Sequence, residues 1–177
     1  MKIIIIFLLL NLHLVSFAQP DYQNRKIRLG TKPNLKFDHW IANIPNDKNL
    51  EGKFIVLEFW ATWCEPCLKN VEHLNKLQSK FNNPNLYFIS ITDEEKNVVQ
   101  NALKKVDFNS IVVSDKRTIN SFWNGGLSKL VIPFTILIDD YGLIKWIGDP
   151  SILNERLINE FITKKLTPFS IYENSKR

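Results

Sequence analysis

The chain has 177 residues, of which 45% are hydrophobic and 23% charged, and its formal net charge is +5. Its basic residues are scattered apart from mild clusters, whereas a nucleic-acid-binding surface gathers them together with exposed aromatic residues. The two cysteines form one close pair and there are only three histidines, which argues against the usual structural zinc site with two pairs of ligands.

The N-terminal residues are typical of a secretory signal peptide. Lys2 precedes an apolar run at residues 3–10, and residues 16–18 provide a small-x-small ending. We expect cleavage near Ala18 and export to the periplasm. The apolar run is short for a membrane span, so we expect no stable membrane insertion.

The remainder has the length of one domain with a substantial core. Residues 19–34 are polar and contain Pro20, Gly30 and Pro33, which predicts an irregular arm. By composition we divide the chain into a signal peptide, an arm with the first element, a globular domain and a tail: 1–18, 19–49, 50–166 and 167–177.

The domain begins with a strand and a helix. Residues 54–60 are apolar on both alternating faces apart from Glu58, as in a central strand covered on both sides. From Cys67 to Phe81, apolar side chains recur every three or four residues, which predicts an amphipathic helix that residues 82–84 (Asn-Asn-Pro) end.

Predicted strands and helices continue to alternate along the chain. Residues 86–91 and 111–113 are predicted strands, and between them lies a predicted helix whose apolar residues extend to Val106. The acidic residues at its start, Asp93 among them, suit helix capping better than a metal or acid–base site.

The C-terminal part ends in a hairpin and a helix. A short helix is predicted at 118–123, and strands at 134–138 and 143–147 flank a turn sequence with Gly142. A last helix is predicted to open at residues 149–151. The whole order predicts an α/β fold with a central mixed sheet, helices on both faces and a C-terminal β-hairpin.

Both cysteines lie where the first predicted strand meets its helix. The C-x-x-C spacing lets the sulfurs of Cys64 and Cys67 meet across one helical turn, so a disulfide can open and close with little backbone movement. Unpaired N–H groups and the helix dipole favour the thiolate of Cys64. A redox pair explains this spacing better than a structural bridge, because closing so short a loop constrains the unfolded chain little.

The histidines are not expected to act with the thiols. His73 lies about half a turn round the helix from Cys64. His39 is interpreted as a surface residue, and His13 lies in the segment expected to be removed. We therefore predict neither a metal nor a cofactor.

The sequence resembles the thioredoxin superfamily, and within it the exported TlpA-like and ResA-like thiol-disulfide oxidoreductases. Residues 59–67 (FWATWCEPC) are similar to the active-site stretch of that family, and residues 131–135 (VIPFT) to its cis-proline segment. The match extends from about Leu50 to Lys165. It departs from the family at residues 68–72, which lack the proline that often kinks the first helix.

The resemblance implies a role for each matching residue. Cys64 would attack a substrate disulfide as the thiolate, and Cys67 would resolve the mixed disulfide. Pro133 is implied to be cis and to lie against the sulfurs, which leaves the backbone of Ile132 free to pair with an extended substrate segment. Trp63 would offer an apolar platform beside the thiols.

Glu58 occupies the place of the family's buried acid. It lies six residues before Cys64 within an apolar strand, so burial is expected to raise its pKa. Such a carboxyl is suited to accept the proton of Cys67 during resolution. The alternative is an ionised structural glutamate that reaches a helix end or a lysine.

We expect a disulfide reductase. Glu65 places a carboxylate beside Cys64, which disfavours the thiolate and so makes the disulfide the more stable form, and no histidine stands between the cysteines. A reductase in an oxidising compartment must be recharged, which implies a membrane electron donor. The family suggests apocytochrome c thiols or misoxidised proteins as substrates.

Two other functions on this fold stay open as alternatives. A peroxiredoxin uses a lone peroxidatic cysteine with a distant resolving cysteine, which the paired spacing argues against. A copper-binding module uses C-x-x-x-C with a distal histidine, whereas here the spacing is one residue shorter and no histidine follows His73.

Overall fold

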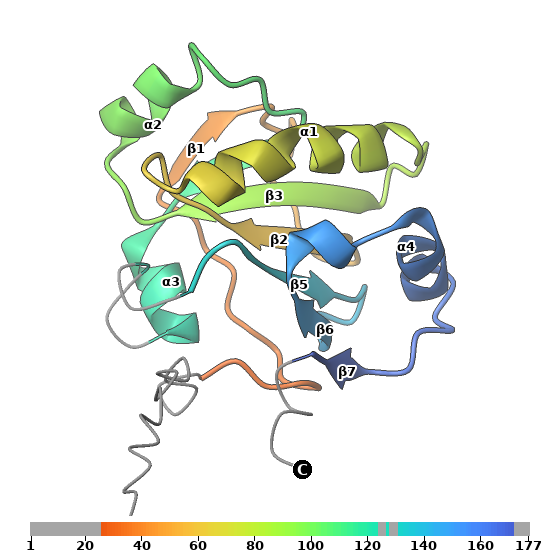
Figure 1. Cartoon of the computed structure of the whole chain (residues 1–177). Helices are drawn as coiled ribbons and strands as arrows, with labels where there is room; N and C mark the ends of the chain where they lie inside the picture. Colours follow the sequence, from red (N-terminus) through yellow and green to blue (C-terminus); the bar gives the residue numbers. More distant parts are fainter. Residues whose placement is uncertain (1–25, 124–126, 128–130, 172–177) are drawn as a thin grey trace, which may run out of the picture.

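The computed structural model describes residues 26–123, 127 and 131–171 (Figure 1). The signal peptide expected at residues 1–18 lies outside this part of the chain. Among the residues that are described, no helix has both the length and the apolar character needed to cross a membrane.

A seven-stranded mixed sheet forms the centre of the molecule, in the order β1-β4-β3-β2-β5-β6-β7. Strands β2, β3 and β4 are parallel to one another, β5 and β1 run antiparallel to their neighbours β2 and β4, and β6 runs antiparallel to β5. The strands are β1 (His39–Ala42), β2 (Phe54–Phe59), β3 (Leu86–Thr92), β4 (Ile111–Ser114), β5 (Phe134–Ile138), β6 (Ile144–Gly148) and β7 (Phe169–Ser170).

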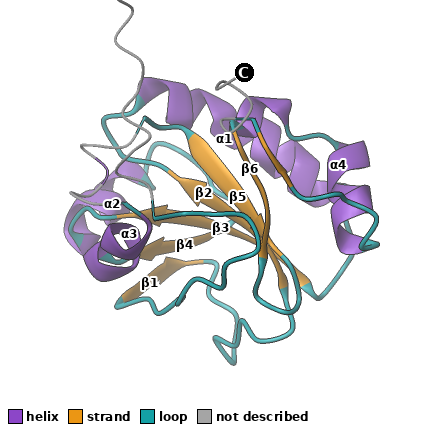
Figure 2. Cartoon of the chain, turned by 90° about the horizontal axis from the view of Figure 1, so that it is seen from below, coloured by secondary structure: helices purple, strands orange, loops and turns teal. Residues whose placement is uncertain are grey.

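Helices cover both faces of this sheet, as Figure 2 shows from below. The helices are α1 (Glu65–Ser79), α2 (Lys96–Ala102), α3 (Lys116–Phe122) and α4 (Glu155–Ile162), with a short 3-10 turn, η3 (Pro150–Ile152), before α4. Helices α1 and α4 lie on one face and α3 on the other. This arrangement confirms the predicted α/β class with a mixed sheet and a β5–β6 hairpin.

Strand β2 is buried along its whole length because both of its faces are covered. Phe54 and Val56 pack in one core cluster with Leu74 of α1. Phe59, on the opposite face, meets Phe122 of α3 edge to face, with ring centroids 5.3 Å apart. The near-continuous apolar run of the sequence therefore reflects a strand between two helical layers.

The sequence did not predict the strands at the two edges of the sheet. Strand β1 pairs antiparallel with β4, and the two-residue β7 pairs parallel with β6. Both are short, so neither leaves an alternating pattern long enough to recognise. Their pairing comes from the exposed edges of the neighbouring strands rather than from their own composition.

The predicted last helix is two elements. Asp149 caps the 3-10 turn by accepting a hydrogen bond from the Ser151 amide, at 2.8 Å. Asn154 then caps α4, with its side-chain oxygen 3.0 Å from the Leu157 amide. A second capping residue within one apolar pattern therefore starts a new helix after Leu153.

The described part of the N-terminal arm has no helix, and it packs against the sheet. Ile27 is buried in the main core. The Gly30 amide donates to the carbonyl of Ile144 at 2.8 Å, and the Ile144 amide donates to the carbonyl of Thr31 at 3.0 Å. The arm thus covers part of the hairpin although its sequence is polar.

Candidate functional site

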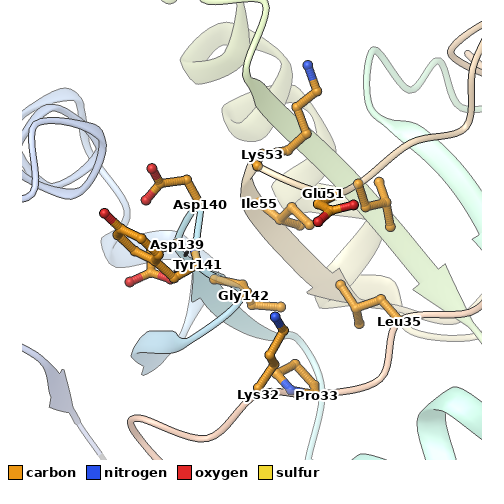
Figure 3. A pocket seen from close by; sticks show the side chains of 13 residues that line it. Lys32, Pro33, Leu35, Glu51, Lys53, Ile55, Asp139, Asp140, Tyr141 and Gly142 are labelled. Carbon is orange, nitrogen blue, oxygen red and sulfur yellow. Dashed lines mark hydrogen bonds between the residues drawn. The ribbon is translucent and has the colours of Figure 1, made fainter.

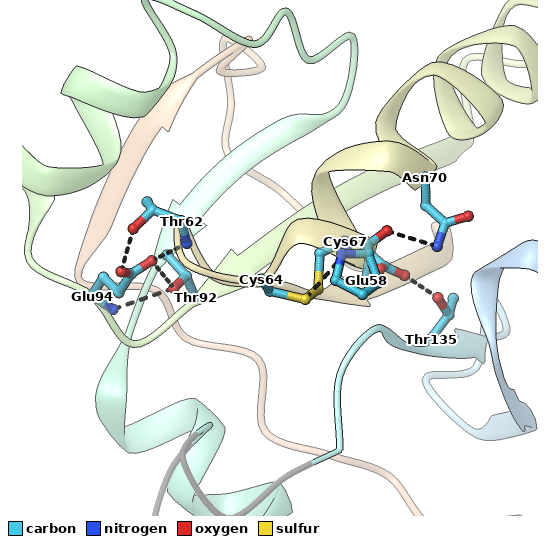
Figure 4. The surroundings of a disulfide bond; sticks show 9 residues. Glu58, Thr62, Cys64, Cys67, Asn70, Thr92, Glu94 and Thr135 are labelled. Atoms are coloured by element: carbon cyan, nitrogen blue, oxygen red, sulfur yellow. Dashed lines mark hydrogen bonds between the residues drawn. A yellow bond between two sulfur atoms is a disulfide. The ribbon is translucent and has the colours of Figure 1, made fainter.

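Cys64 and Cys67 form a disulfide at the N-terminal end of α1 (Figure 4). Cys64 is the N-cap residue of this helix, and its Sγ accepts a hydrogen bond from the Cys67 amide at 3.2 Å. A sulfur at this position lies next to the partial positive charge of the helix N-terminus, which favours a negatively charged group. The fold therefore places Cys64 where a thiolate is stabilised.

Burial alone does not distinguish the two cysteines in the disulfide form. Cys64 is 4% exposed and Cys67 is 3% exposed. Their positions differ instead, because Cys64 caps the helix and Cys67 lies inside its first turn, on the stripe that faces the sheet. That stripe continues through Val71 and Leu74, which are buried with it.

A tight turn leads from β2 into the disulfide. The Cys64 amide donates to the carbonyl of Ala61 at 3.0 Å, so Thr62 and Trp63 are the central residues of the turn. Trp63 is 61% exposed, whereas Trp60 is buried in the core. The structure thus places Trp63 on the surface next to the disulfide, where the sequence predicted an apolar platform.

Thr62 is bound by Glu94, one of the acidic residues that were predicted to cap a helix. Its amide and its hydroxyl each donate to the carboxylate of Glu94, both at 2.7 Å. Asp93 accepts from the Leu127 amide at 2.9 Å. The prediction of helix capping is therefore wrong for Asp93 and Glu94. The neighbouring acid Glu95 is the N-cap residue of α2, which begins at Lys96, although its side chain makes no capping bond.

The proline segment lies at the same end of the sheet as the disulfide. The peptide bond between Ile132 and Pro133 is cis. β5 begins directly after it, at Phe134, which pairs with Phe59 at the end of β2. Ile132 and Pro133 are half-buried, and within the described residues the backbone of Ile132 makes no hydrogen bond.

Glu58 points to the face of the sheet that carries α1. It lies two residues after Val56, and therefore on the same face of the strand as Val56, which packs against that helix. Because α1 runs back over β2, its first turn lies above the last residues of the strand. Figure 4 accordingly draws Glu58 beside Cys67.

The carboxyl group of Glu58 is buried with one hydrogen-bond donor. Glu58 is 4% exposed and lies opposite Thr135 of β5, whose hydroxyl donates to its Oε2. Its Oε1 is also buried and has no hydrogen-bond partner among the described residues. Burial raises the pKa of this carboxyl well above its usual value, the Thr135 hydrogen bond lowers it by less, and the charge of Asp149 raises it again. The described contacts include neither the lysine nor the helix end of the structural alternative.

Glu65 differs from Glu58 in being fully solvated. Its Oε1 lies 2.7 Å from the Lys69 Nζ, one helical turn further on. The hydrogen bond and the charge of Lys69 lower the pKa of Glu65. Glu65 is therefore a carboxylate at neutral pH, but its charge is partly offset by Lys69, which weakens its expected effect on Cys64.

The two histidines in the described part of the chain, His39 and His73, lie apart from the disulfide, as expected, and His13 lies outside that part. The ring Nε2 of His73 is 3.0 Å from the carbonyl oxygen of Leu153, and His39 lies on the exposed edge strand β1. In the part of the chain that is described, no cluster of His, Cys, Asp and Glu could hold a metal ion.

A cavity of about 370 Å³ lies at the other end of the sheet, where β2 begins and β5 ends (Figure 3). The arm, with Lys32, forms one wall and the β5–β6 turn, with Asp139 and Tyr141, forms another. Its lining carries both signs of charge and none of the residues at the disulfide. This cavity is therefore separate from the candidate site.

Known proteins are similar to this chain in sequence and in fold. The Redoxin family model matches residues 41–155. Thiol-disulfide oxidoreductase ResA of a Bacillus cereus strain is 35% identical over 126 residues, which are 68% of each chain. A candidate protein disulfide isomerase from Bacteroides thetaiotaomicron has a TM-score of 0.63 at 22% identity, covering 79% of this chain and 93% of that one. For a thiol:disulfide interchange protein from Chlorobium tepidum TLS the TM-score is 0.58 at 21% identity, with coverage of 79% and 99%. These two structures support the fold.

Proposed function

Given that this chain belongs to the Redoxin family, as a ResA-like thiol-disulfide oxidoreductase of the thioredoxin superfamily, we propose that it is an exported reductase of protein disulfides. The observation that carries this proposal is the Cys64–Cys67 disulfide at the N-terminus of α1, with Glu58 buried beneath that end of the helix.

The reaction begins with the reduced form of the pair. The Cys64 thiolate attacks one sulfur of a substrate disulfide, a new S–S bond joins Cys64 to that sulfur, and the other substrate sulfur leaves as a thiolate and takes a proton from solvent. Cys67 then gives its proton to the Glu58 carboxylate and attacks the Sγ of Cys64. The second substrate sulfur leaves as a thiolate and takes a proton from solvent, Glu58 returns its proton to solvent, and two electrons have passed from the enzyme to the substrate.

The surroundings of the disulfide suit a protein substrate. The backbone of Ile132 offers a hydrogen-bonding edge for an extended segment. Trp63 and Val131, 61% and 60% exposed, supply apolar surface for its side chains. Apocytochrome c and proteins with misoxidised cysteines fit this requirement. A membrane protein that donates electrons would restore the dithiol form of Cys64 and Cys67.

We expect the pair to be a reductant at equilibrium. The Glu65 carboxylate disfavours the Cys64 thiolate, so equilibration with glutathione should give a potential nearer to about −270 mV than to about −120 mV. Glu65→Gln should raise the potential, and Lys69→Met, which exposes the Glu65 charge, should lower it. A wild-type value above about −180 mV would reverse the assignment to an oxidase or isomerase.

Export rests on the apolar run and the small-x-small ending at residues 16–18. When the full chain is expressed in a bacterium, N-terminal sequencing of the periplasmic protein should begin at or near Gln19. An intact N-terminus on a cytoplasmic product would contradict this part of the proposal and leave the chemistry untouched.

A further inference from the structure

The turn after β3 reaches across to the turn that carries the disulfide. β3 is parallel to β2 and adjacent to it, so the two strands end side by side, with Ile91 paired to Phe59. Beyond this pair, the Trp60 amide donates to the carbonyl of Ile91 at 3.1 Å. The residues that follow each strand are thus brought together at one edge of the sheet, although about 30 residues separate them in the chain.

Glu94 makes the main side-chain contact between these two turns. Its Oε2 accepts from the Thr62 amide and its Oε1 from the Thr62 hydroxyl, both at 2.7 Å. The Thr92 hydroxyl lies 3.2 Å from the same Oε2, and the Glu94 amide donates back to that hydroxyl at 3.3 Å. Because the carboxylate binds both the amide and the hydroxyl of Thr62, it fixes both the backbone and the side chain of that residue.

Helix capping and surface charge pairing do not account for Glu94. The N-cap residue of α2 is Glu95, and Glu95 forms an exposed ion pair with Lys116, at 2.8 Å. Glu94 instead is half-buried and directs its carboxylate to Thr62. Figure 4 shows this pair on the side of the disulfide opposite to Glu58 and Thr135.

We propose that Glu94 is a positioning residue of the redox site, which holds the turn that presents Trp63 and Cys64. Thr62 is a central residue of that turn, closed by the hydrogen bond from Cys64 to Ala61. Disulfide exchange requires the attacking sulfur to approach along the S–S bond that breaks, so a small displacement of Cys64 slows the reaction. This inference rests on the disulfide chemistry proposed above.

Three variants separate geometry from charge. Glu94→Gln keeps an acceptor for the Thr62 amide and a donor toward the Thr62 hydroxyl, but it removes the charge. Glu94→Ala removes the charge and both bonds. Glu95→Gln is the matched control. It also removes one negative charge, but from the next residue along the chain, whose side chain is exposed.

The test measures the second-order rate constant with which each reduced protein reacts with a disulfide-linked peptide, under conditions where urea unfolding shows that every variant is folded. We expect Glu94→Ala to react about tenfold or more slowly, and Glu94→Gln and Glu95→Gln to retain most of the rate. A rate for Glu94→Gln as low as that of Glu94→Ala would assign the effect to charge and overturn the positioning role. So would an unchanged rate in Glu94→Ala.

Thr62→Val supplies a second test that survives if Glu94→Ala does not fold. It keeps the side-chain shape and removes the hydroxyl bond while leaving the bond from the Thr62 amide to Glu94, so we expect a rate between those of the wild type and Glu94→Ala. An unchanged rate in Thr62→Val would contradict the proposal. A wild-type protein that fails to react with the peptide at all refutes the proposed function, whereas equal rates in all proteins refute only the role of Glu94.

Discussion

Cys64→Ser is expected to reduce turnover of protein disulfides to the background rate, while Cys67→Ser still forms mixed disulfides with the same substrates. Only Cys64 has a sulfur at the helix N-cap, where the first turn stabilises a thiolate. Without Cys67 the mixed disulfide has no resolving thiol nearby. Mass spectrometry after acid quenching should detect the trapped adduct in Cys67→Ser and none in Cys64→Ser.

Structural damage does not account for these losses, because serine preserves the start of the helix. The Cys64 side chain accepts a hydrogen bond from the Cys67 amide, and a serine hydroxyl at an N-cap accepts such a bond as well. The stability of each variant should therefore match that of the reduced wild type in urea unfolding. Equal alkylation rates of the two thiols in the reduced wild-type protein would contradict the assigned order of attack.

The core of the site was predictable from sequence because it depends on neighbours in the chain. The C-x-x-C spacing after a buried strand predicted the disulfide at a helix start, and the isolated Glu58 in an apolar run predicted a buried acid. The pair formed by Glu65 and Lys69 also had a local signal, the four-residue spacing on a helix. That signal was not used in predicting the effect of Glu65 on Cys64.

The rest depended on contacts between distant residues. An acidic residue after a strand fits a helix cap as well as a bond to another loop, so nothing in the sequence around Glu94 indicates its partner, Thr62, 32 residues earlier. Thr135 could have been found from strand pairing, since it stands opposite Glu58 in the β2–β5 register. The short strand β1 had no such signal, because its place at the edge of the sheet is set by β4.

Glu58→Gln is expected to slow resolution about a hundredfold while attack by Cys64 is less affected, so mixed disulfide should accumulate. Glutamine keeps the shape of the side chain and an acceptor for Thr135, but it cannot take the proton of Cys67. Rapid acid quenching during a single turnover measures both steps. Glu72→Gln, which removes an exposed carboxylate from the outer side of α1, is the control and should resolve at the wild-type rate.

Glu58→Gln should raise the stability of the folded protein although it slows resolution. Because the pKa of Glu58 is raised in the folded protein, the folded state binds a proton that the unfolded chain releases once the pH exceeds the unfolded value, about 4.3. Wild-type stability therefore falls, relative to the Gln variant, as pH rises from that value to the folded pKa, and the difference is constant above it. At neutral pH we expect Glu58→Gln to be more stable, by on the order of 1 kcal/mol or more, and the gain to vanish near pH 4.

Urea unfolding from pH 4 to pH 9 measures this gain, with Glu72→Gln again as the control. The exposed Glu72 has a pKa lowered by its bond to Lys76, so its replacement should give no gain at neutral pH. A catalytic carboxyl held in an unfavourable environment predicts a slower and more stable variant together. If Glu58→Gln instead loses stability at neutral pH and resolves the mixed disulfide as fast as the wild type, Glu58 is an ionised structural residue and Cys67 gives its proton to another acceptor.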